Sequence, residues 1–190
     1  MLNGDKDMDI PEDVQNIWDK YNLPENVRRH CIKVAEVALK IAERIKERGH
    51  DIDLESVKKG ALLHDIGRAI THDPFKHFII SGEILRKEGF DDKIVKIAER
   101  HFSAGVTKDD AIKLCLPVID NFMPETLEEK IVCYADKIVK GDKEITFEQF
   151  LKRLDDLKNN NPETRWFTEK TKERVIKLKQ ELETLAGTKL

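Results

Sequence analysis

The chain has 190 residues, a formal net charge of −3 and three cysteines, Cys31, Cys115 and Cys133, which form no C-x-x-C pair. This length suits one domain, and the cysteines indicate neither a disulfide framework nor a cysteine zinc site. The lack of a positive net charge argues against nucleic acid as a partner, and no apolar run is long enough to cross a membrane. We therefore expect a cytoplasmic protein that binds any anionic substrate through local cations or a metal.

Apolar residues recur at helical spacing along most of the chain, and no β alternation of useful length is present. Asp53, Thr107 and Thr146 are suitable N-caps, while glycines and prolines mark helix ends. The expected helices cover residues 11–21, 24–49, 53–67, 75–87, 91–101, 111–116, 125–140, a segment capped by Thr146, and 162–187.

These elements predict an all-α helical bundle. Residues 1–10 are expected to be a flexible leader, residues 11–140 the main domain, and residues 141–190 accessory helices packed on that domain. The accessory segment contains no chemical motif. Its amphipathic helices could instead form a homodimer face, although intramolecular packing is the default expectation.

Charged residues interrupt the apolar helices at specific positions. His64 and Asp65 lie side by side in Gly60-Ala61-Leu62-Leu63-His64-Asp65-Ile66-Gly67-Arg68, which otherwise has the composition of a buried helix. A buried ion needs a partner, a hydrogen bond or a metal. The dyad could hydrogen-bond to nearby structure, or it could be the centre of a metal site.

Other helices supply further candidates. His30 shares the apolar face of its helix with Val34, and Asp136 lies between Val132 and Val139 on another apolar face. A carbonyl could satisfy His30, and Lys137 or Lys140 could pair with Asp136. His77 and His101, taken singly, are also compatible with structural roles.

Together, four histidines and two aspartates occupy inward or helix-end positions, and imidazole with carboxylate suits divalent metal ions. Adjacent helical residues point about 100° apart. His64 and Asp65 can therefore chelate one ion only if the helix loosens near Gly67. Otherwise Asp65 could bridge two ions.

The order His30, His64-Asp65, Asp136 resembles the HD-domain superfamily of metal-dependent phosphohydrolases. The segment RRHCIKVAEVALKIAERI is similar to the first-histidine helix of that family, GALLHDIGR to its dyad in the HDIG variant, and YADKIV to its final aspartate helix. The resemblance covers residues 24–140 and extends over the whole chain to small archaeal HDIG proteins. No G-Y-P motif is present.

The resemblance implies an HD-type helical bundle in which His30, His64, Asp65 and Asp136 bind one metal. His77 and His101 match two further histidines of binuclear members, in which Asp65 would bridge. One or two ions of Mn, Fe, Ni, Co, Mg or Zn are therefore expected. The sequence does not choose among these metals.

The first functional hypothesis is hydrolysis of a phosphomonoester or phosphodiester, in a small phosphorylated substrate such as a nucleotide, by metal-activated water. Asp65 would orient or deprotonate this water. Arg68 and Lys137 are the favoured catalytic cations because they adjoin motif residues, and Arg68, Lys76, Arg100 and Lys137 are the candidate substrate-binding residues. For each cation alone, a solvated surface position is the competing interpretation.

Two alternatives use the same residues differently. A di-iron oxygenase could employ this ligand set, and a non-catalytic nucleotide-binding regulatory module could retain the fold without turnover. The complete set of six metal-binding side chains argues against the regulatory module.

Overall fold

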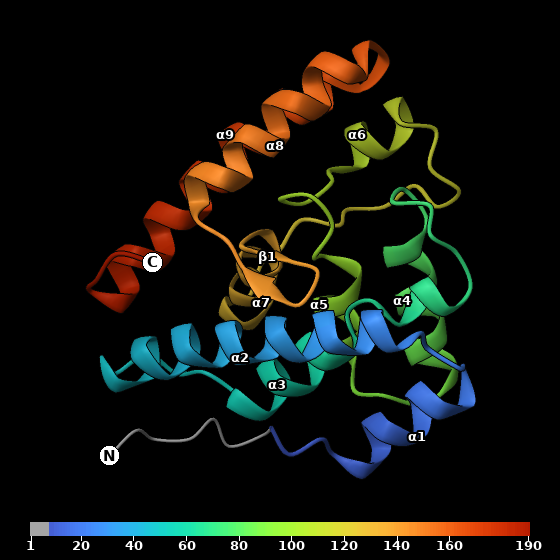
Figure 1. Ribbon diagram of the computed structural model, residues 1–190, viewed down its shortest axis with the longest axis vertical. Helices are drawn as coiled ribbons and strands as arrows, with labels where there is room; N and C mark the ends of the chain where they lie inside the picture. Colours follow the sequence, from blue (N-terminus) through green and yellow to red (C-terminus); the bar gives the residue numbers. More distant parts are fainter. Residues whose placement is uncertain (1–7) are drawn as a thin grey trace.

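The computed structural model describes residues 8–190, which fold into a helical bundle (Figure 1). Residues 1–7, most of the expected leader, lie outside the described residues. The helices, with two 3-10 turns labelled η, are α1 (Glu12–Lys20), α2 (Glu25–Glu47), α3 (Leu54–Leu63), η1 (Ile66–Ala69), α4 (His77–Lys87), α5 (Asp92–Glu99), α6 (Lys108–Lys113), α7 (Leu127–Lys137), α8 (Phe147–Asn160), η2 (Pro162–Thr164) and α9 (Arg165–Ala186). The all-α prediction is confirmed for the described residues, which add only a small hairpin of β1 (Val139–Lys140) and β2 (Lys143–Glu144).

The bundle is organised around α2, which crosses the molecule and packs against α3 and α7 (Figure 1). Helix α5 packs on α3 and α7, and α4 packs on α5. The apolar stripe of α2 is buried in this core, as its spacing predicts. Its members are Val27, Val34, Val37, Ala38, Ile41 and Ile45.

Helix α3 ends earlier than predicted. Asp53 caps its start, since the Asp53 Oδ1 atom accepts a hydrogen bond from the Ser56 N–H at 3.1 Å. The α-helix stops at Leu63, and Asp65, with φ −104° and ψ 15°, leads into η1. The backbone therefore leaves α-helical geometry at the His64-Asp65 dyad. A Cβ atom on Gly67 would lie 2.1 Å from the His77 carbonyl oxygen, so glycine permits the close approach of η1 and α4.

Helix α7 also ends earlier than predicted, at Lys137 rather than Lys140. Gly141 has a φ of +62° and turns the chain, so that Val139 and Lys140 pair with the β2 strand. A left-handed glycine followed by Asp142 favours a tight turn over a continued helix. The turn has a consequence for the site, because the Gly141 carbonyl lies beside His30.

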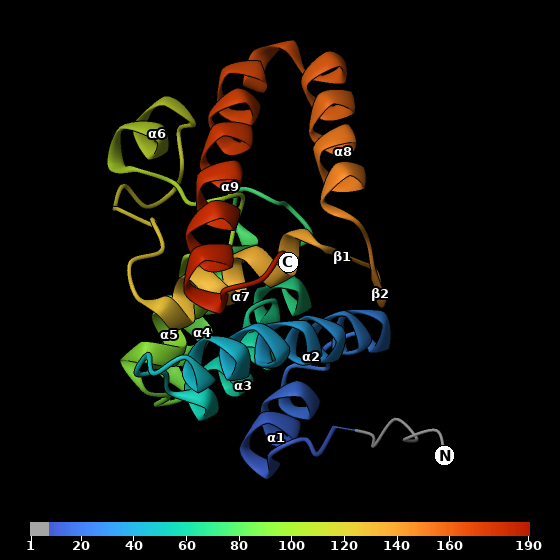
Figure 2. The ribbon, with the colours of Figure 1, turned by 90° about the vertical axis from the view of Figure 1, so that its left-hand side faces the viewer.

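Helices α8 and α9 rise side by side from the bundle (Figure 2), and α9 also packs against α2 and α7. Lys172 of α9 pairs with Asp155 of α8 at 2.9 Å, and Lys170 of α9 pairs with Asp110 of α6 at 2.8 Å. The C-terminal segment thus contacts the rest of the molecule. The division of the chain into a leader, a main domain and accessory helices stays a prediction.

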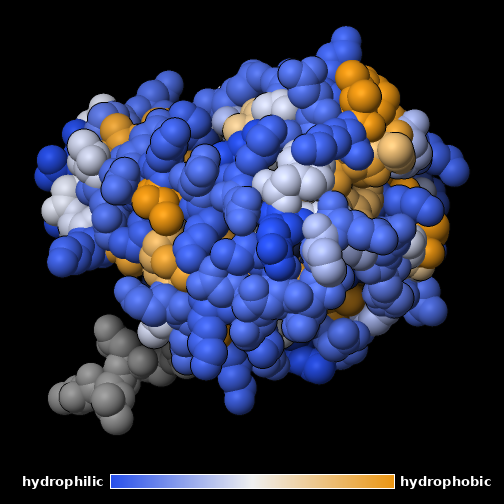
Figure 3. All heavy atoms as spheres, turned by 90° about the horizontal axis from the view of Figure 1, so that it is seen from above, coloured by the Kyte–Doolittle hydropathy of each residue, from blue (hydrophilic) through white to orange (hydrophobic). Residues whose placement is uncertain are grey.

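The surface seen from above is mostly hydrophilic, with separate hydrophobic patches (Figure 3). The large apolar side chains that are exposed are Ile70, Ile112, Val118, Ile119 and Leu157. Within residues 8–190, no helix combines the length and the apolar character needed to cross a membrane.

Candidate metal centre

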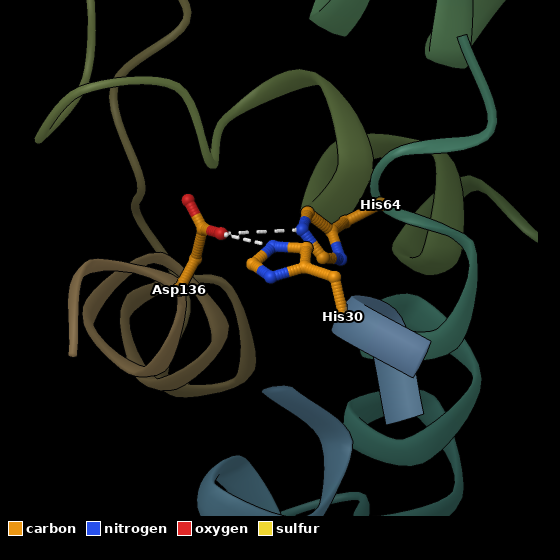
Figure 4. Close-up of side chains that lie close together, drawn as sticks. All are labelled: His30, His64 and Asp136. Carbon is orange, nitrogen blue, oxygen red and sulfur yellow. Dashed lines mark hydrogen bonds and ion pairs between the residues drawn. The ribbon is translucent and has the colours of Figure 1, made fainter. Parts of the chain in front are cut away.

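Three elements that are distant in sequence bring His30, His64 and Asp136 together (Figure 4). His30 comes from α2, His64 follows the end of α3, and Asp136 comes from the last turn of α7. The Asp136 Oδ1 atom lies 3.0 Å from the His30 Nε2 atom and 3.3 Å from the His64 Nε2 atom. These three donor atoms lie within 4.8 Å of one another, close enough to bind a single ion.

A second pair of histidines lies on the other side of Asp65. His77 is the first residue of α4, and His101 follows the end of α5. The Asp65 Oδ1 atom lies 3.2 Å from the His77 Nε2 atom and 3.3 Å from the His101 Nε2 atom. The Asp65 Oδ2 atom lies 3.7 Å from the His64 Nε2 atom and 3.8 Å from the His30 Nε2 atom. Each carboxylate oxygen of Asp65 therefore faces one histidine pair.

All four histidines are oriented by backbone carbonyls. The Nδ1 atoms of His30, His64, His77 and His101 lie 2.6–2.9 Å from the carbonyl oxygens of Gly141, Ala61, Pro74 and Ala98, respectively. An Nδ1–H that donates to a carbonyl leaves Nε2 without a proton and with its lone pair free, as metal-ligating histidines require. The same carbonyls therefore fix both the tautomer and the direction of each ring.

This arrangement fits a cation better than it fits a hydrogen-bond network. The His77 Nε2 and His101 Nε2 atoms are 3.0 Å apart, and a neutral imidazole whose Nδ1–H donates to a carbonyl has no proton on Nε2 to share. The buried His64 Nε2 and Asp65 Oδ1 atoms have no hydrogen-bond partner. Buried polar atoms without partners are costly, so a metal ion would satisfy atoms that the protein leaves unpaired.

The ionisation of Asp65 and of the histidines also bears on the binding of a cation. Burial by itself raises the pKa of the Asp65 carboxyl, but the neighbouring imidazoles hold that pKa well below its usual range. Burial lowers the pKa of His101 to about 4, so this ring is neutral at pH 7. Burial also lowers the pKa of His64, but the Asp65 charge outweighs burial and holds that pKa well above its ordinary value. His64 would therefore release a proton on binding a divalent ion, which takes carboxylates and neutral imidazoles as ligands.

Arg68 and Lys137 lie at the edge of the cluster and line the adjoining cavity. The Arg68 Nε–H donates to the Asp65 Oδ2 atom at 2.8 Å, and the Lys137 ammonium donates to the Asp136 Oδ2 atom at 2.5 Å. Both cations therefore lie beside candidate metal ligands and face the cavity.

The structure does not bring Lys76 and Arg100 to the cavity. Lys76 is half exposed and lies 3.6 Å from Asp73 in its own turn. Arg100 pairs with Glu129 at 2.9 Å and with Glu125 at 3.2 Å. Glu129 is buried at the start of α7, so it draws Arg100 away from its neighbour His101 and into a structural ion pair.

The cavity beside the cluster has a volume of about 580 Å³ and includes side chains that the sequence motifs do not mark. His72 is exposed and lines this cavity. The C-terminal helices provide much of the remaining wall. Further lining residues are Asn26, Phe75, Phe102, Lys140, Phe150, Arg153, Leu154, Asn161, Phe167, Thr168 and Thr171. Arg153 could have been found from the sequence, because it lies three residues after Phe150 and so interrupts the apolar face of α8 with a charge.

The bundle and the cluster define a helical protein with a candidate two-metal centre. The chain belongs to the HD domain family, whose model matches residues 27–141, and this is a family of metal-dependent phosphohydrolases. An uncharacterized protein of Methanocaldococcus jannaschii is 43% identical over 85% of this chain and 90% of its own length. A tRNA (cytidine(56)-2'-O)-methyltransferase of Thermoplasma volcanium is 36% identical over 96% of this chain. The match covers 50% of that methyltransferase, so this chain spans about half its length.

Solved structures show the same fold. The HD domain of the L. monocytogenes phosphodiesterase PgpH superposes with a TM-score of 0.53 and 19% identity, over 94% of this chain and 99% of the PgpH chain. The same domain in complex with cyclic-di-AMP gives a TM-score of 0.51 and 18% identity, over 95% and 99% of the two chains. At this identity, the likeness shows the fold of the chain alone.

Proposed function

We propose that this protein hydrolyses a phosphomonoester or phosphodiester bond of a nucleotide with metal-activated water as the nucleophile. The observation that supports this most directly is the position of Asp65, with one carboxylate oxygen toward His30 and His64 and the other toward His77 and His101. Two-metal hydrolytic sites use a bridging group of this kind. The cyclic-di-AMP bound to the PgpH domain supports a nucleotide as the substrate.

The six side chains would divide between two ions. His30, His64 and Asp136 would hold one ion, His77 and His101 the other, and Asp65 would contact both. A bound divalent ion lowers the pKa of water from about 15.7 toward 7 and so supplies a nucleophile at neutral pH. The identity of the ion, among Mn, Fe, Ni, Co, Mg and Zn, is not set by histidine and carboxylate ligands alone.

The remaining roles fall to residues of the cavity edge. Asp65, as a carboxylate, would orient the attacking water or accept its proton. Arg68 and Lys137 would neutralise the phosphate oxygens, whose negative charge must be compensated as the bond to the leaving group breaks. Lys140 and Arg153 line the same cavity, whereas Lys76 and Arg100 do not, so we place substrate binding on the former pair.

Metal content and ester hydrolysis, followed as phosphate release from monoesters and as monoester formation from diesters, test this proposal when measured on one sample. The protein is purified anaerobically, analysed by elemental mass spectrometry, and assayed against a panel of nucleotides and nucleotide diesters. We expect two equivalents of metal and phosphate-ester hydrolysis. His64→Ala should lose metal and activity while remaining folded. His50→Ala, at a histidine outside the cavity lining, is the matched control and should lose neither.

The other outcomes distinguish the alternatives. Two irons with O₂ consumption and no hydrolysis would favour the di-iron oxygenase. Nucleotide binding without metal or turnover, even after addition of Mn²⁺, Fe²⁺, Ni²⁺ or Co²⁺, would favour the regulatory module. An unchanged metal content in folded His64→Ala would contradict the proposed ligand set.

A further inference from the structure

One wall of the cavity is aromatic. Phe75, Phe102 and Phe167, together called the phenylalanine wall, come from the turn before α4, the segment after α5 and the first turns of α9. The Phe102 ring centroid lies 5.8 Å from that of His77, so the wall begins directly beside the second histidine pair. Three elements that are remote in sequence thus place a π surface next to the candidate metal centre.

The wall is held rigidly. The Phe102 ring stacks on Phe78 at 5.0 Å with an interplanar angle of 9°, and it lies 6.1 Å from Phe167. The Phe75 ring meets Phe102 at 5.6 Å and 72°, an edge-to-face contact. A rigid aromatic surface binds a planar ligand with little loss of conformational entropy. Phe102 is already covered by Phe78, so Phe75 presents the more available face.

The turn that bears Phe75 is fixed by hydrogen bonds. The Asp73 Oδ1 atom accepts from the Phe75 N–H at 2.9 Å, and the Asp73 carbonyl accepts from the Lys76 and His77 N–H groups at 3.1 Å and 3.0 Å. The turn therefore sets the position of Phe75 relative to His77. Phe75 nevertheless stays only partly buried and lines the cavity. Phe167, whose ring centroid lies 6.4 Å from that of Phe75, is only 4% exposed.

Two polar side chains from the end of α8 and from α9 lie in the same cavity as the phenylalanine wall. Asn161 and Thr168 both line it. The Asn161 Nδ2 atom donates to the Leu157 carbonyl at 3.0 Å, which leaves its Oδ1 atom as an acceptor. An aromatic surface with amide and hydroxyl groups nearby matches a nucleobase, which has π faces and a polar edge. A sugar phosphate without a base has no aromatic face to stack on Phe75.

We propose that the phenylalanine wall, with Phe75 as the stacking residue, is a base-binding subsite that makes this site selective for nucleoside phosphates over phosphate esters that lack a base. The proposal rests on the proposed function, since the phosphate group would lie at the metal centre. It assigns a role to the C-terminal segment, because Phe167 and Thr168 of α9 form part of the subsite.

Uncleavable phosphonates test this subsite without requiring turnover. Isothermal titration of the metal-loaded 190-residue chain compares methylene-phosphonate analogues of adenosine, guanosine, cytidine and uridine monophosphates with methylphosphonate, which lacks a base. We expect at least one nucleoside analogue to bind about tenfold or more tightly than methylphosphonate, as aromatic stacking typically contributes. Phe75→Ala should remove most of that preference and leave methylphosphonate binding unchanged.

Matched variants separate stacking from folding. Phe75→Trp should keep the preference, while Phe75→Leu, which retains apolar volume, should lose most of it. Phe90→Ala truncates another partly buried phenylalanine that does not line the cavity, and it should keep the preference. Equal binding of all probes by the unmodified protein, or an undiminished preference in folded Phe75→Leu, would overturn the proposal.

The outcomes also distinguish this subsite from the proposed hydrolase activity. Hydrolysis of base-free esters as efficiently as nucleotides would leave the hydrolase standing and refute the subsite. Phe75-dependent binding of nucleoside phosphonates without hydrolysis of any ester would support the subsite and refute the hydrolase.

Discussion

We expect Asp110→Asn to destabilise the protein at neutral pH and to lose part of this effect in acid. Asp110 is fully buried in α6, and its carboxylate faces Lys170 at 2.8 Å and Arg174 at 2.7 Å, both from α9. Its Oδ2 atom also accepts from the Thr107 N–H at 3.1 Å. Burial raises the pKa of Asp110, but hydrogen bonds from Lys170, Thr107 and Arg174 outweigh burial and lower it to about 2.

The magnitude follows from the pKa difference between the folded and unfolded states. The ordinary value of 3.8 falls to about 2 on folding, a difference of nearly two pH units. At about 1.4 kcal/mol per unit, the carboxylate contributes about 2.5 kcal/mol to the free energy of unfolding at pH 7. Because the folded pKa is the lower one, this contribution is present above pH 3.8 and disappears as the pH falls through 2. About half of it should remain at pH 3.

Urea unfolding at pH 7 and pH 3 measures this contribution. The difference in free energy of unfolding between the unmodified protein and Asp110→Asn should shrink by about 1 kcal/mol between the two pH values. Asp155→Asn is the matched control, since Asp155 also pairs with a lysine of α9 but is 42% exposed, and exposed pairs contribute little. A difference for Asp110→Asn that does not change between pH 7 and pH 3 would refute the reasoning.

Three further changes are expected to have measurable effects. Removing metal with a chelator should lower the melting temperature, and refilling to 1,000 times the Kd should raise it by about 8–16 °C, corresponding to about 4 kcal/mol; no shift would contradict a bound metal. Gly67→Ala should destabilise by about 3 kcal/mol in urea unfolding, because its Cβ would lie 2.1 Å from the His77 carbonyl oxygen; an unchanged midpoint would contradict that contact. Trp18→Phe should cost about 1–3 kcal/mol in the same assay, because the buried Trp18 Nε1–H donates to the Leu62 carbonyl at 3.1 Å; an unchanged stability would show that water replaces the indole.

Local sequence patterns predicted the helical bundle and indicated which polar side chains point inward. The apolar stripes decided which helix faces are buried, so His30 and Asp136, which interrupt such stripes, had to point inward. His77 and His101 needed the family resemblance, because each lies at a helix end, where a histidine is ordinary. The structure brings these four side chains together with Asp65.

The structure departs from the sequence-based expectations where residues distant in the chain determine the direction of a side chain. Arg100 is one of the four candidate substrate-binding cations, with a solvated surface position as the competing interpretation. The buried carboxylate of Glu129, 29 positions away in the chain, determines its direction instead. The phenylalanine wall was missed for the same reason, since Phe75, Phe102 and Phe167 share no motif and meet only after α9 has packed.

The connection between the wall and the metal centre is mechanical as well as spatial. The segment that follows His101 is fastened to α9 at Ser103, whose hydroxyl contacts that of Thr171, and at Gly105, whose carbonyl accepts from Arg174 at 3.0 Å. Arg174 also pairs with Asp110 farther along the same segment. Since His101 would bind metal and α9 would help bind the base, these bonds couple the two halves of the site. Loss of these bonds would therefore shift the segment that bears His101 as well as the base-binding side of the cavity.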